Sequence, residues 1–514
     1  MTFDLAGLLA AHRGEQFDLH DEFMNPQLVN VLSTLGFDRC YVRGEGAELI
    51  DDRGDRYLDL LSGFGVFALG RSHPVIKDAL HQALDADLPN LVQLDCALLS
   101  GLLAQALVGK AHAGIERVFF ANSGAESVET AIKFARCATS RERILYCGHA
   151  FHGLTTGALA LNGGKEFRKG FGRLLPGATE IPFGDLGALE RALSGGDVAA
   201  LVVEPIQGKG VYMAPDGFWP AAQALCRSRG ALLVMDEVQT GLGRTGAFFC
   251  HQHWGLEPDI ITVSKALSGG YVPVGAVLTS TAVFDAVYSS MDRAVVHSST
   301  FSKNQLAMVA GLATLQVIEE DGIVEHARVT GQRFMEALRP LVDRYELLHE
   351  VRGMGLMIGL EFGAPTTRGR ARFRLMELAR PGIFSQLIVV PLFNRHRILT
   401  QVAADNVNII KLLPPLIIGD AEIERFVSAL DDVLADAERS AGLLVEVGRT
   451  MATNAVRHRR HTRHVRHAGP PAPSATPATP ATPAMPATPA TPATPATPAT
   501  PTTPATPHRS GGGR

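Results

Sequence analysis

Several residues with reactive side chains come directly after short apolar segments of the chain. Asp236 and Glu237 follow the segment ALLVM, and Lys265 follows DIITVS. Carboxylates that follow a buried strand lose hydration unless they are paired, so we expect a cation beside them. An amine at such a position can bond covalently to an aldehyde. The pattern indicates a site that combines an acid with a nucleophilic amine.

Two further segments end in residues that suit a phosphorylated aromatic ligand. Ser123, Gly124 and Ala125 follow the apolar segment RVFFA and open a helical stretch. A small, hydroxylated turn at a helix N-terminus presents free backbone N–H groups to an anion, although an ordinary helix cap explains the same residues. Phe151 and His152 follow RILYCG and add an aromatic ring and an imidazole.

These groups together suit a cofactor that carries a phosphate, an aromatic ring with a cationic nitrogen, and an aldehyde. Pyridoxal phosphate has all three features. A lysine can hold its aldehyde, a carboxylate can keep its ring nitrogen protonated, and an aromatic side chain can stack on the ring. We predict pyridoxal 5'-phosphate as the cofactor, and we predict no metal site.

The elements that must position these residues are short apolar strands that alternate with longer helical segments. We expect the strands at 117–121, 143–148, 200–205, 231–237, 259–264 and 275–280. Strands of nearly continuous apolar residues are typical of a parallel sheet covered on both faces, and ligands bind at the carboxyl ends of such strands. The sequence therefore predicts an α/β fold with a large, doubly wound, mostly parallel sheet.

The segments on either side predict a second, smaller α+β domain that is discontinuous in sequence. We assign residues 1–62 and 326–446 to it, and 63–325 to the large cofactor-binding domain. Within the second segment we expect single strands at 351–362 and 409–418. A long helical stretch at about 304–347 and a final helix at about 420–445 complete this expectation.

Composition separates a globular body from a different C-terminal tail at 447–514. The chain has 514 residues, 46% of them hydrophobic and 19% charged, with a formal net charge of −4. Residues 457–514 hold seven Arg, no Asp or Glu, and 14 of the 30 prolines, mostly in Pro-Ala-Thr triplets. Such a segment cannot build a core, so we predict a disordered tail in which four histidines and the arginines could attract a metal or polyanions.

The acidic body disfavours nucleic-acid binding, which needs clustered Lys and Arg. No stretch has the length and apolar character of a membrane span or a signal peptide. Six cysteines lie without a CxxC pair and read as reduced, mostly buried thiols. We expect a cytoplasmic protein.

The motifs also resemble a known family, the class III (ω-amino) aminotransferases of pyridoxal phosphate fold type I. The resemblance covers about residues 20–445 and rests on LLVMDEVQTGLGRTG at 232–246 followed by DIITVSKALSGG at 259–270. Supporting motifs are FFANSGAESVETAIKFAR, the FHG triplet, VEPIQG and HSSTFSKNQLA. The acetylornithine, ornithine and putrescine aminotransferases are the members that it resembles.

The resemblance implies a role for each matching residue. Lys265 would be the Schiff-base lysine and proton shuttle, and Asp236 the partner of the pyridine nitrogen. Phe151 would stack on the cofactor ring, and Gln239 would contact the ring hydroxyl. Glu204 would support the site from behind, and the phosphate would be bound by Ser123, Gly124 and Ala125, with Thr300 reaching it from the second subunit of a homodimer.

Two departures from the family pattern concern the substrate. Many members carry Arg, which grips a substrate carboxylate, where this chain has Lys411 in KLLPPL. Ornithine-type members carry a partner Glu where this chain has Lys209. With Phe64 and Val66 at an apolar entrance, these changes favour an ω-amine, a diamine or the corresponding aldehyde as substrate, with a keto acid as the other reactant. The alternatives are that Lys411 does the work of the Arg and that Phe64 and Val66 are packing residues.

Three other functions stay open on the sequence alone. An acetylornithine- or ornithine-type enzyme that uses 2-oxoglutarate would fit the same motifs. So would an aminomutase, racemase or decarboxylase on the same fold. A binding protein without catalysis is disfavoured because Asp236 and Lys265 are both present.

Overall fold

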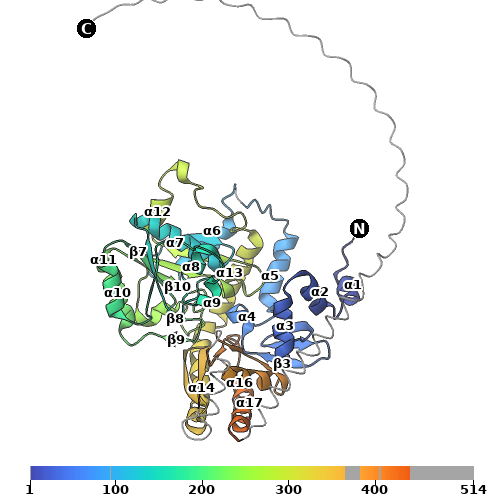
Figure 1. Cartoon of the computed structure of the whole chain (residues 1–514). Coiled ribbons are helices and arrows are strands. Elements are labelled where there is room, and N and C mark those ends of the chain that lie inside the picture. Colours follow the sequence, from blue (N-terminus) through green and yellow to red (C-terminus); the bar gives the residue numbers. More distant parts are fainter. Residues whose placement is uncertain (1, 93, 365–382, 404–406, 440–514) are drawn as a thin grey trace, which may run out of the picture. The chain divides into compact units, whose positions relative to one another are not determined.

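A seven-stranded sheet lies at the centre of the α/β fold in the computed structural model, which describes residues 2–92, 94–364, 383–403 and 407–439 (Figure 1). Its strand order is β4-β12-β11-β10-β7-β5-β6. The strands are β4 (Arg117–Ala121), β12 (Gly275–Thr279), β11 (Ile260–Val263), β10 (Leu232–Asp236), β7 (Val198–Val203), β5 (Arg143–Cys147) and β6 (Ala178–Ile181). The predicted fold class is confirmed.

One predicted strand of this sheet runs against the others. β12 pairs antiparallel with β11 on one side and with β4 on the other, whereas β11, β10, β7, β5 and β6 pair in parallel. The connection from β11 to β12 holds only a short 3-10 helix, η2 (Lys265–Ser268), and it is too short for the crossover that a parallel pair needs. β6 was not predicted, because three of its four residues are polar or small.

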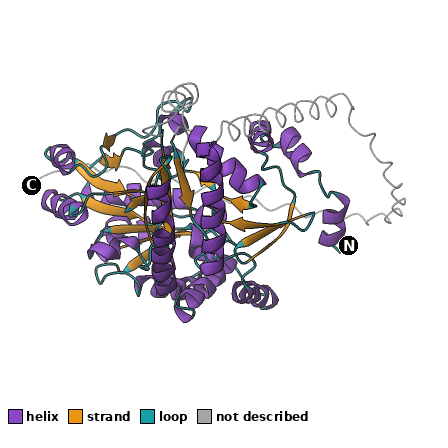
Figure 2. Ribbon diagram, turned by 90° about the horizontal axis from the view of Figure 1, so that it is seen from below, coloured by secondary structure: helices purple, strands orange, loops and turns teal. Residues whose placement is uncertain are grey.

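Helices cover both faces of the large sheet, as a doubly wound fold requires (Figure 2). On one face α7 (Gly124–Thr139) and α12 (Thr281–Val287) share an apolar cluster with β5, β7, β10 and β11. On the other face α10 (Leu186–Leu193) and α11 (Phe218–Arg229) pack against residues of β5, β6, β7 and β10. Side chains that point alternately to the two faces are therefore buried on both.

Segments from both ends of the chain form the smaller α+β part. The N-terminal strands β1 (Tyr41–Glu45), β2 (Glu48–Asp51) and β3 (Arg56–Asp59) form antiparallel pairs, and β15 (Ile398–Leu399) adds in parallel to β3. A second sheet has the order β13-β14-β17-β16. Its strands are β13 (Leu348–Met354), β14 (Met357–Phe362), β17 (Ile409–Leu412) and β16 (Gln401–Val402). A strand from the C-terminal segment thus pairs with the N-terminal hairpin, as the prediction of a discontinuous part requires, while the division into two domains and its boundaries at 62, 325 and 446 stay predictions.

Three predicted elements have different bounds in the structure. The single strand expected at 351–362 is a hairpin of β13 and β14, because Gly355 adopts a φ of +55° and reverses the chain. The long helical stretch is two helices, α13 (Gln305–Glu320) and α14 (Ile323–Arg344), separated by Gly322 at a φ of +60°. The strand expected at 409–418 ends at Leu412, before the two prolines.

The remaining elements surround these sheets. They are α1 (Leu5–Ala11), α2 (Gln16–Phe23), α3 (Pro26–Leu35), α4 (Ser62–Gly65), α5 (Pro74–Asp85), α6 (Leu98–Val108), α8 (Thr156–Ala160), α9 (Lys165–Arg168), β8 (Ile206–Gln207), β9 (Tyr212–Met213), η1 (Cys250–Trp254), η3 (Met291–Arg293), α16 (Ile383–Asn394) and α17 (Asp420–Arg439). None of the helices in the described part of the chain has the length and apolar character to cross a membrane. The predicted tail at 447–514 lies outside the described residues.

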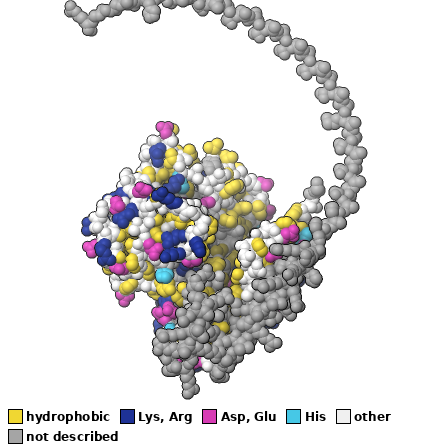
Figure 3. All heavy atoms as spheres, in the orientation of Figure 1, with side chains coloured by type: hydrophobic (Ala, Val, Ile, Leu, Met, Phe, Trp, Pro, Cys, Tyr) yellow, Lys and Arg dark blue, Asp and Glu magenta, His cyan; other side chains and the backbone are white. Residues whose placement is uncertain are grey.

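Charged side chains of both signs are interspersed on the face drawn in Figure 3. Three of the six cysteines are buried, Cys96 and Cys137 are exposed, and Cys40 is intermediate. The expectation of mostly buried thiols was therefore wrong for half of them. All six are free of disulfides, as expected.

Candidate active site

Parallel pairing brings the predicted residues to one edge of the large sheet. Asp236 is the last residue of β10, and Lys265 begins η2 just after the neighbouring strand β11. Phe151 and His152 follow β5, and Ser123 follows β4. These carboxyl ends meet at the edge where ligands bind in such folds.

Asp236 is buried and holds three hydrogen bonds. Its Oδ1 accepts from the hydroxyl of Thr262 at 3.0 Å and from the backbone N–H of Val238 at 3.1 Å. Its Oδ2 lies 2.7 Å from Nδ1 of His152. The carboxylate is thus fixed in one orientation at the end of its strand.

His152 is the cation expected beside that carboxylate. Its side chain is fully buried, and its Nε2 has no hydrogen-bond partner among the described residues. Burial lowers its pKa, but the hydrogen bond and charge of Asp236, with the charge of Glu204, outweigh burial and raise the pKa above its usual value. The pair therefore favours a protonated imidazole that donates to Asp236.

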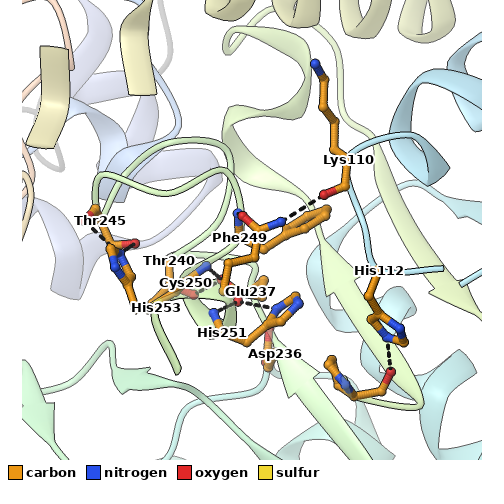
Figure 4. Close-up of polar contacts among 12 residues, drawn as sticks. Lys110, His112, Asp236, Glu237, Thr240, Thr245, Phe249, Cys250, His251 and His253 are labelled. Carbon is orange, nitrogen blue, oxygen red and sulfur yellow. Dashed lines mark hydrogen bonds and ion pairs between the residues drawn. The ribbon is translucent and has the colours of Figure 1, made fainter. Parts of the chain in front are cut away.

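Glu237 points to the other side of the strand end and has its own imidazole partner (Figure 4). Its Oε1 lies 3.0 Å from Nδ1 of His251 and accepts the backbone N–H of the same residue at 2.8 Å. Its Oε2 accepts from the hydroxyl of Thr240 at 2.5 Å and from the N–H of Cys250 at 3.0 Å. Glu237 thus fastens the loop after β10 to η1 and leaves Asp236 to face the site.

Lys265 occupies a strained backbone position at the start of η2. Its φ is +39°, in a region that residues other than glycine seldom adopt. Burial lowers the pKa of its amine, while the charges of Asp236 and Glu204 oppose this shift without cancelling it. The lowered pKa favours the neutral amine, which is the form that attacks a carbonyl or takes up a proton.

The N-terminus of α7 has the geometry of an anion site. Ser123 caps the helix, and its hydroxyl accepts the N–H of Glu126 at 3.2 Å. The N–H groups of the first helical residues, Gly124 and Ala125, have no acceptor within the helix. A Cβ on Gly124 would lie only 2.9 Å from Val238, so only glycine lets the helix start this close to the loop after Asp236.

Glu204 ties two loops of the site together. Its Oε2 accepts the N–H of Phe151 at 3.2 Å, and its Oε1 accepts the N–H of Gly208 at 3.0 Å. Burial and the neighbouring Asp236 raise the pKa of its carboxyl group, against the opposing effects of His152 and the two N–H donors. Glu204 fixes the backbone that carries the Phe151 ring.

Gln239, Lys411 and Phe64 meet on another wall. Gln239 donates to the backbone carbonyl of Phe64 at 3.2 Å. Nζ of Lys411 donates to the carbonyl of Gly208 at 2.7 Å and to Oε1 of Gln239 at 3.3 Å, and lies 5.8 Å from the Phe64 ring centroid. Burial, followed by the charge of Lys265, lowers the pKa of Lys411 to about 7.

Two predicted residues make no such contacts. Thr300 is exposed and lies in the exposed stretch between α12 and α13, where Phe301 is also exposed. Val66 is half-buried just after α4, whose residue Phe64 has a φ of +64° and is exposed.

Residues 33–434 match the family model described as aminotransferase class-III. The chain belongs to this family. The match spans the predicted large domain, about half of the predicted N-terminal segment and most of the predicted C-terminal one. It therefore includes every residue of the candidate site.

Two curated members of the class-III aminotransferases show how similar the chain is to known proteins. It is 37% identical to aminotransferase PigE of Serratia sp. over 454 residues, which cover 82% of this chain and 53% of that protein. It is 35% identical to the putrescine aminotransferase of Pectobacterium atrosepticum, with 83% of this chain and 90% of that protein covered. The chain thus spans about half the length of one relative and nearly all of the other.

Two solved class-III structures share the fold. The ornithine aminotransferase of Toxoplasma gondii has a TM-score of 0.70 and 29% identity, over 78% of this chain and 91% of that one. An amine transaminase from an uncultivated Pseudomonas species, solved in a PLP-bound form, has a TM-score of 0.68 and 30% identity, over 77% and 94% of the two chains. Fold type I is therefore the fold of this chain.

Pyridoxal phosphate is the cofactor of the class-III aminotransferases, and the residues present fit it. A buried carboxylate suits a protonated ring nitrogen, and the start of α7 suits a phosphate. The unpaired Nε2 of His152 is a buried polar atom that the protein alone leaves unsatisfied.

The sequence reasoning gave no role to His152 or Thr262. The FHG triplet was visible, but a histidine after a strand is usually a surface residue, and only the structure places this one against Asp236. Thr262 belongs to an apolar strand and gives no signal of its own.

Proposed function

We propose that this protein is a pyridoxal-phosphate-dependent aminotransferase. It moves an amino group between an ω-amine or diamine, or the corresponding aldehyde, and a keto acid, one substrate after the other. The observation that carries this proposal is the placement of Lys265 beside the fixed carboxylate Asp236 in a class-III chain. The putrescine aminotransferase of Pectobacterium atrosepticum, 35% identical to this chain, supports an amine as the donor, and monoamines and diamines are both candidates.

The chain's residues divide the work as follows. When bound, pyridoxal phosphate supplies an aldehyde that bonds to amines and a ring that accepts electrons. Asp236 would keep the proton on the ring nitrogen, and His152 and Thr262 hold Asp236 in place for this task. Nζ of Lys265 would take a proton from the substrate carbon that bears the amino group and deliver it to the former aldehyde carbon of the cofactor, since its lowered pKa favours the neutral amine.

The other proposed contacts position the reactants. Phe151 would stack on the cofactor ring, with its backbone held by Glu204. Ser123, Gly124 and Ala125 would bind the phosphate. Gln239 would reach the ring hydroxyl, although here it is bonded to Lys411 and Phe64.

Lys411 would hold the carboxylate of the keto acid. Its buried ammonium group contacts two acceptors and can donate a third hydrogen bond. It binds as a point charge, without the two-pronged geometry of arginine. Phe64 and Val66 would form the apolar entrance.

A homodimer is part of the proposal. Large apolar side chains are exposed around Thr300, among them Met291, Val295 and Phe301. A monomer seldom exposes such a group, and a partner subunit would cover it. Thr300 would then reach the phosphate in the partner's site. The cytoplasm is the proposed location, supported by six cysteines without a disulfide.

The test is whether an amine alone converts the bound cofactor from its aldehyde form to its amine form, followed by visible absorbance. We expect this conversion in the wild type, and a keto acid should reverse it. Lys265→Ala should abolish both the absorbance of the bound aldehyde and the transfer, whereas Lys77→Ala, an exposed lysine of α5, should change neither.

A decarboxylase or racemase would turn over its substrate without accumulating the amine form of the cofactor. That result would replace the proposed reaction by another on the same fold. Normal absorbance in the Lys265→Ala protein would show that the lysine has been assigned wrongly.

A further inference from the structure

Two lysines adjoin the same glycine on the substrate side of the site. Nζ of Lys411 donates to the carbonyl of Gly208, and Lys209 is the next residue. After burial and the charge of Lys265, the charge of Lys209 also lowers the pKa of Lys411, which places the two cations within electrostatic reach of one another. The wall of the site between Gly208 and β17 therefore carries two lysine side chains.

Lys209 is held in place by three contacts. Its Nζ lies 3.0 Å from Oε1 of Glu166, 3.9 Å from the ring centroid of Phe167 and 5.6 Å from that of Phe151. The two rings meet edge to face at 5.6 Å, and the lysine side chain is only 11% exposed. Its charge is thus fixed next to the ring proposed to stack on the cofactor.

The carboxylates around this wall are already engaged. Glu204 accepts two backbone N–H groups, and Glu166 is paired with Lys209. Asp236 is bonded to His152, Thr262 and Val238. Below about pH 7, a second ammonium group on a substrate would meet the ammonium groups of both Lys209 and Lys411 here, while each of these three carboxylates already holds hydrogen-bond donors.

We infer that Lys209 and Lys411 restrict the amine donor to monoamines with an uncharged, apolar far end and discriminate against diamines. This inference rests on the proposed function and chooses between the amines that it allows. A substrate whose charge stays unpaired in a partly desolvated site binds less tightly than one without that charge, which gives specificity. The same two lysines attract the carboxylate of a keto acid, so one site can bind the acid and disfavour a diamine. The exposed ring of Phe64, whose centroid lies 5.8 Å from Nζ of Lys411, is an apolar surface that the far end of the amine could contact.

The test compares hexan-1-amine with pentane-1,5-diamine, which have the same number of heavy atoms and differ in one terminal charge. The readout is the second-order rate at which each amine converts the bound cofactor to its amine form. We expect the wild type to favour the monoamine by about tenfold or more. Lys209→Met should raise the diamine rate relative to the monoamine rate by roughly fivefold, whereas Lys209→Arg should keep the ratio of the wild type.

Lys110→Met is the matched control. Lys110 also combines a carboxylate partner, Glu319 at 3.2 Å, with an aromatic ring, Phe248 at 5.9 Å, and its side chain is partly exposed. Its substitution should leave the ratio of the two rates unchanged. In the wild type the ratio should fall between about pH 6 and about pH 8, because Lys411, faced by Lys265, Lys209 and Glu204, loses its charge in that range.

Equal rates for the two amines in the wild type would overturn the inference. So would a ratio that neither Lys209→Met nor Lys411→Met changes, or that is constant over the pH range. Failure of every amine to convert the cofactor would instead refute the proposed function, so the two failures are distinguishable.

Discussion

At the scale of single residues, the site depends on charges that are held in place before any ligand binds. Asp236 has three donors around its two oxygens, and the imidazole of His152 supplies the shortest of these contacts. A carboxylate fixed in this way does not need to reorganise when a cationic ring nitrogen arrives. Its orientation is a property of the folded chain.

The His152–Asp236 pair predicts a pH-dependent stability. In the cofactor-free protein we expect His152→Ala to lower the free energy of unfolding by about 1–3 kcal/mol. The pKa of His152 is raised in the fold, so the folded protein binds the proton more tightly than the unfolded chain. The loss should therefore be full at acid pH and should shrink as pH rises through the folded-state pKa.

Urea denaturation at about pH 6 and about pH 8 measures this difference. His152→Asn is the control, because its amide can still donate to Asp236 but carries no charge, so its effect should vary less with pH. A larger loss at the higher pH would contradict the assignment of a protonated imidazole.

Residues with reactive side chains could be predicted from the sequence. Residues that act only by hydrogen-bonding to those side chains could not. Lys265 and Asp236 could be found because they follow apolar strands, and strand order brings such positions together. Thr262 gave no signal, because its role is a single hydrogen bond across two strands. Thr300 was predicted for a partner's site; in the single chain it is exposed, and its neighbour Ser299 accepts a hydrogen bond from Asn122, next to the start of α7.

At the scale of elements, the positions of the turns decide where strands and helices begin and end. The reversal at Gly355 and the break at Gly322 both need a positive φ, and a glycine in an apolar segment does not reveal by itself whether the chain will turn there. This is why the hairpin β13–β14 was predicted as one strand. The start of α7 was predicted correctly, because Ser123 is a strong helix cap.

The start of α7 predicts a cofactor-binding defect for Gly124→Ala. The added Cβ would lie 2.9 Å from Val238, whose N–H holds Asp236, so either the helix or the loop must move. We expect affinity for pyridoxal phosphate to fall by about tenfold or more, measured by absorbance titration of the cofactor-free protein.

Gly187→Ala serves as the comparison. Gly187 also lies in the first turn of a helix, α10, but a Cβ there meets only side-chain ends, those of Arg191 at 3.2 Å and Asp185 at 3.4 Å. This variant should bind the cofactor normally. Equal affinities for the two variants would show that the close approach of α7 to the loop after β10 is unimportant.

At the scale of the whole molecule, the exposed apolar side chains near Thr300 predict a dimer with shared active sites. If Thr300 acts in the partner's site, Thr300→Glu should repel the phosphate there. Mixed dimers of Thr300→Glu with Lys265→Ala would then hold one intact site, with Lys265 from one subunit and Thr300 from the other.

Activity should therefore reappear when the two inactive proteins are unfolded and refolded together. Light scattering should show dimers in each preparation. No recovery in proven mixed dimers would place Thr300 in the site of its own chain, or outside any site.

The parallel pairing of β3 with β15 also orders events in time. Leu58 of β3 pairs with Ile398 of β15, so β3 lacks this neighbouring strand until the ribosome has added about 340 further residues. At roughly 5–20 residues per second, the N-terminal hairpin spends about 20–70 seconds of synthesis without its neighbour. The large sheet is complete once β12 has emerged, so it can form first. The edge of β3 is therefore unpaired during this period, and an unpaired strand edge can pair with another chain.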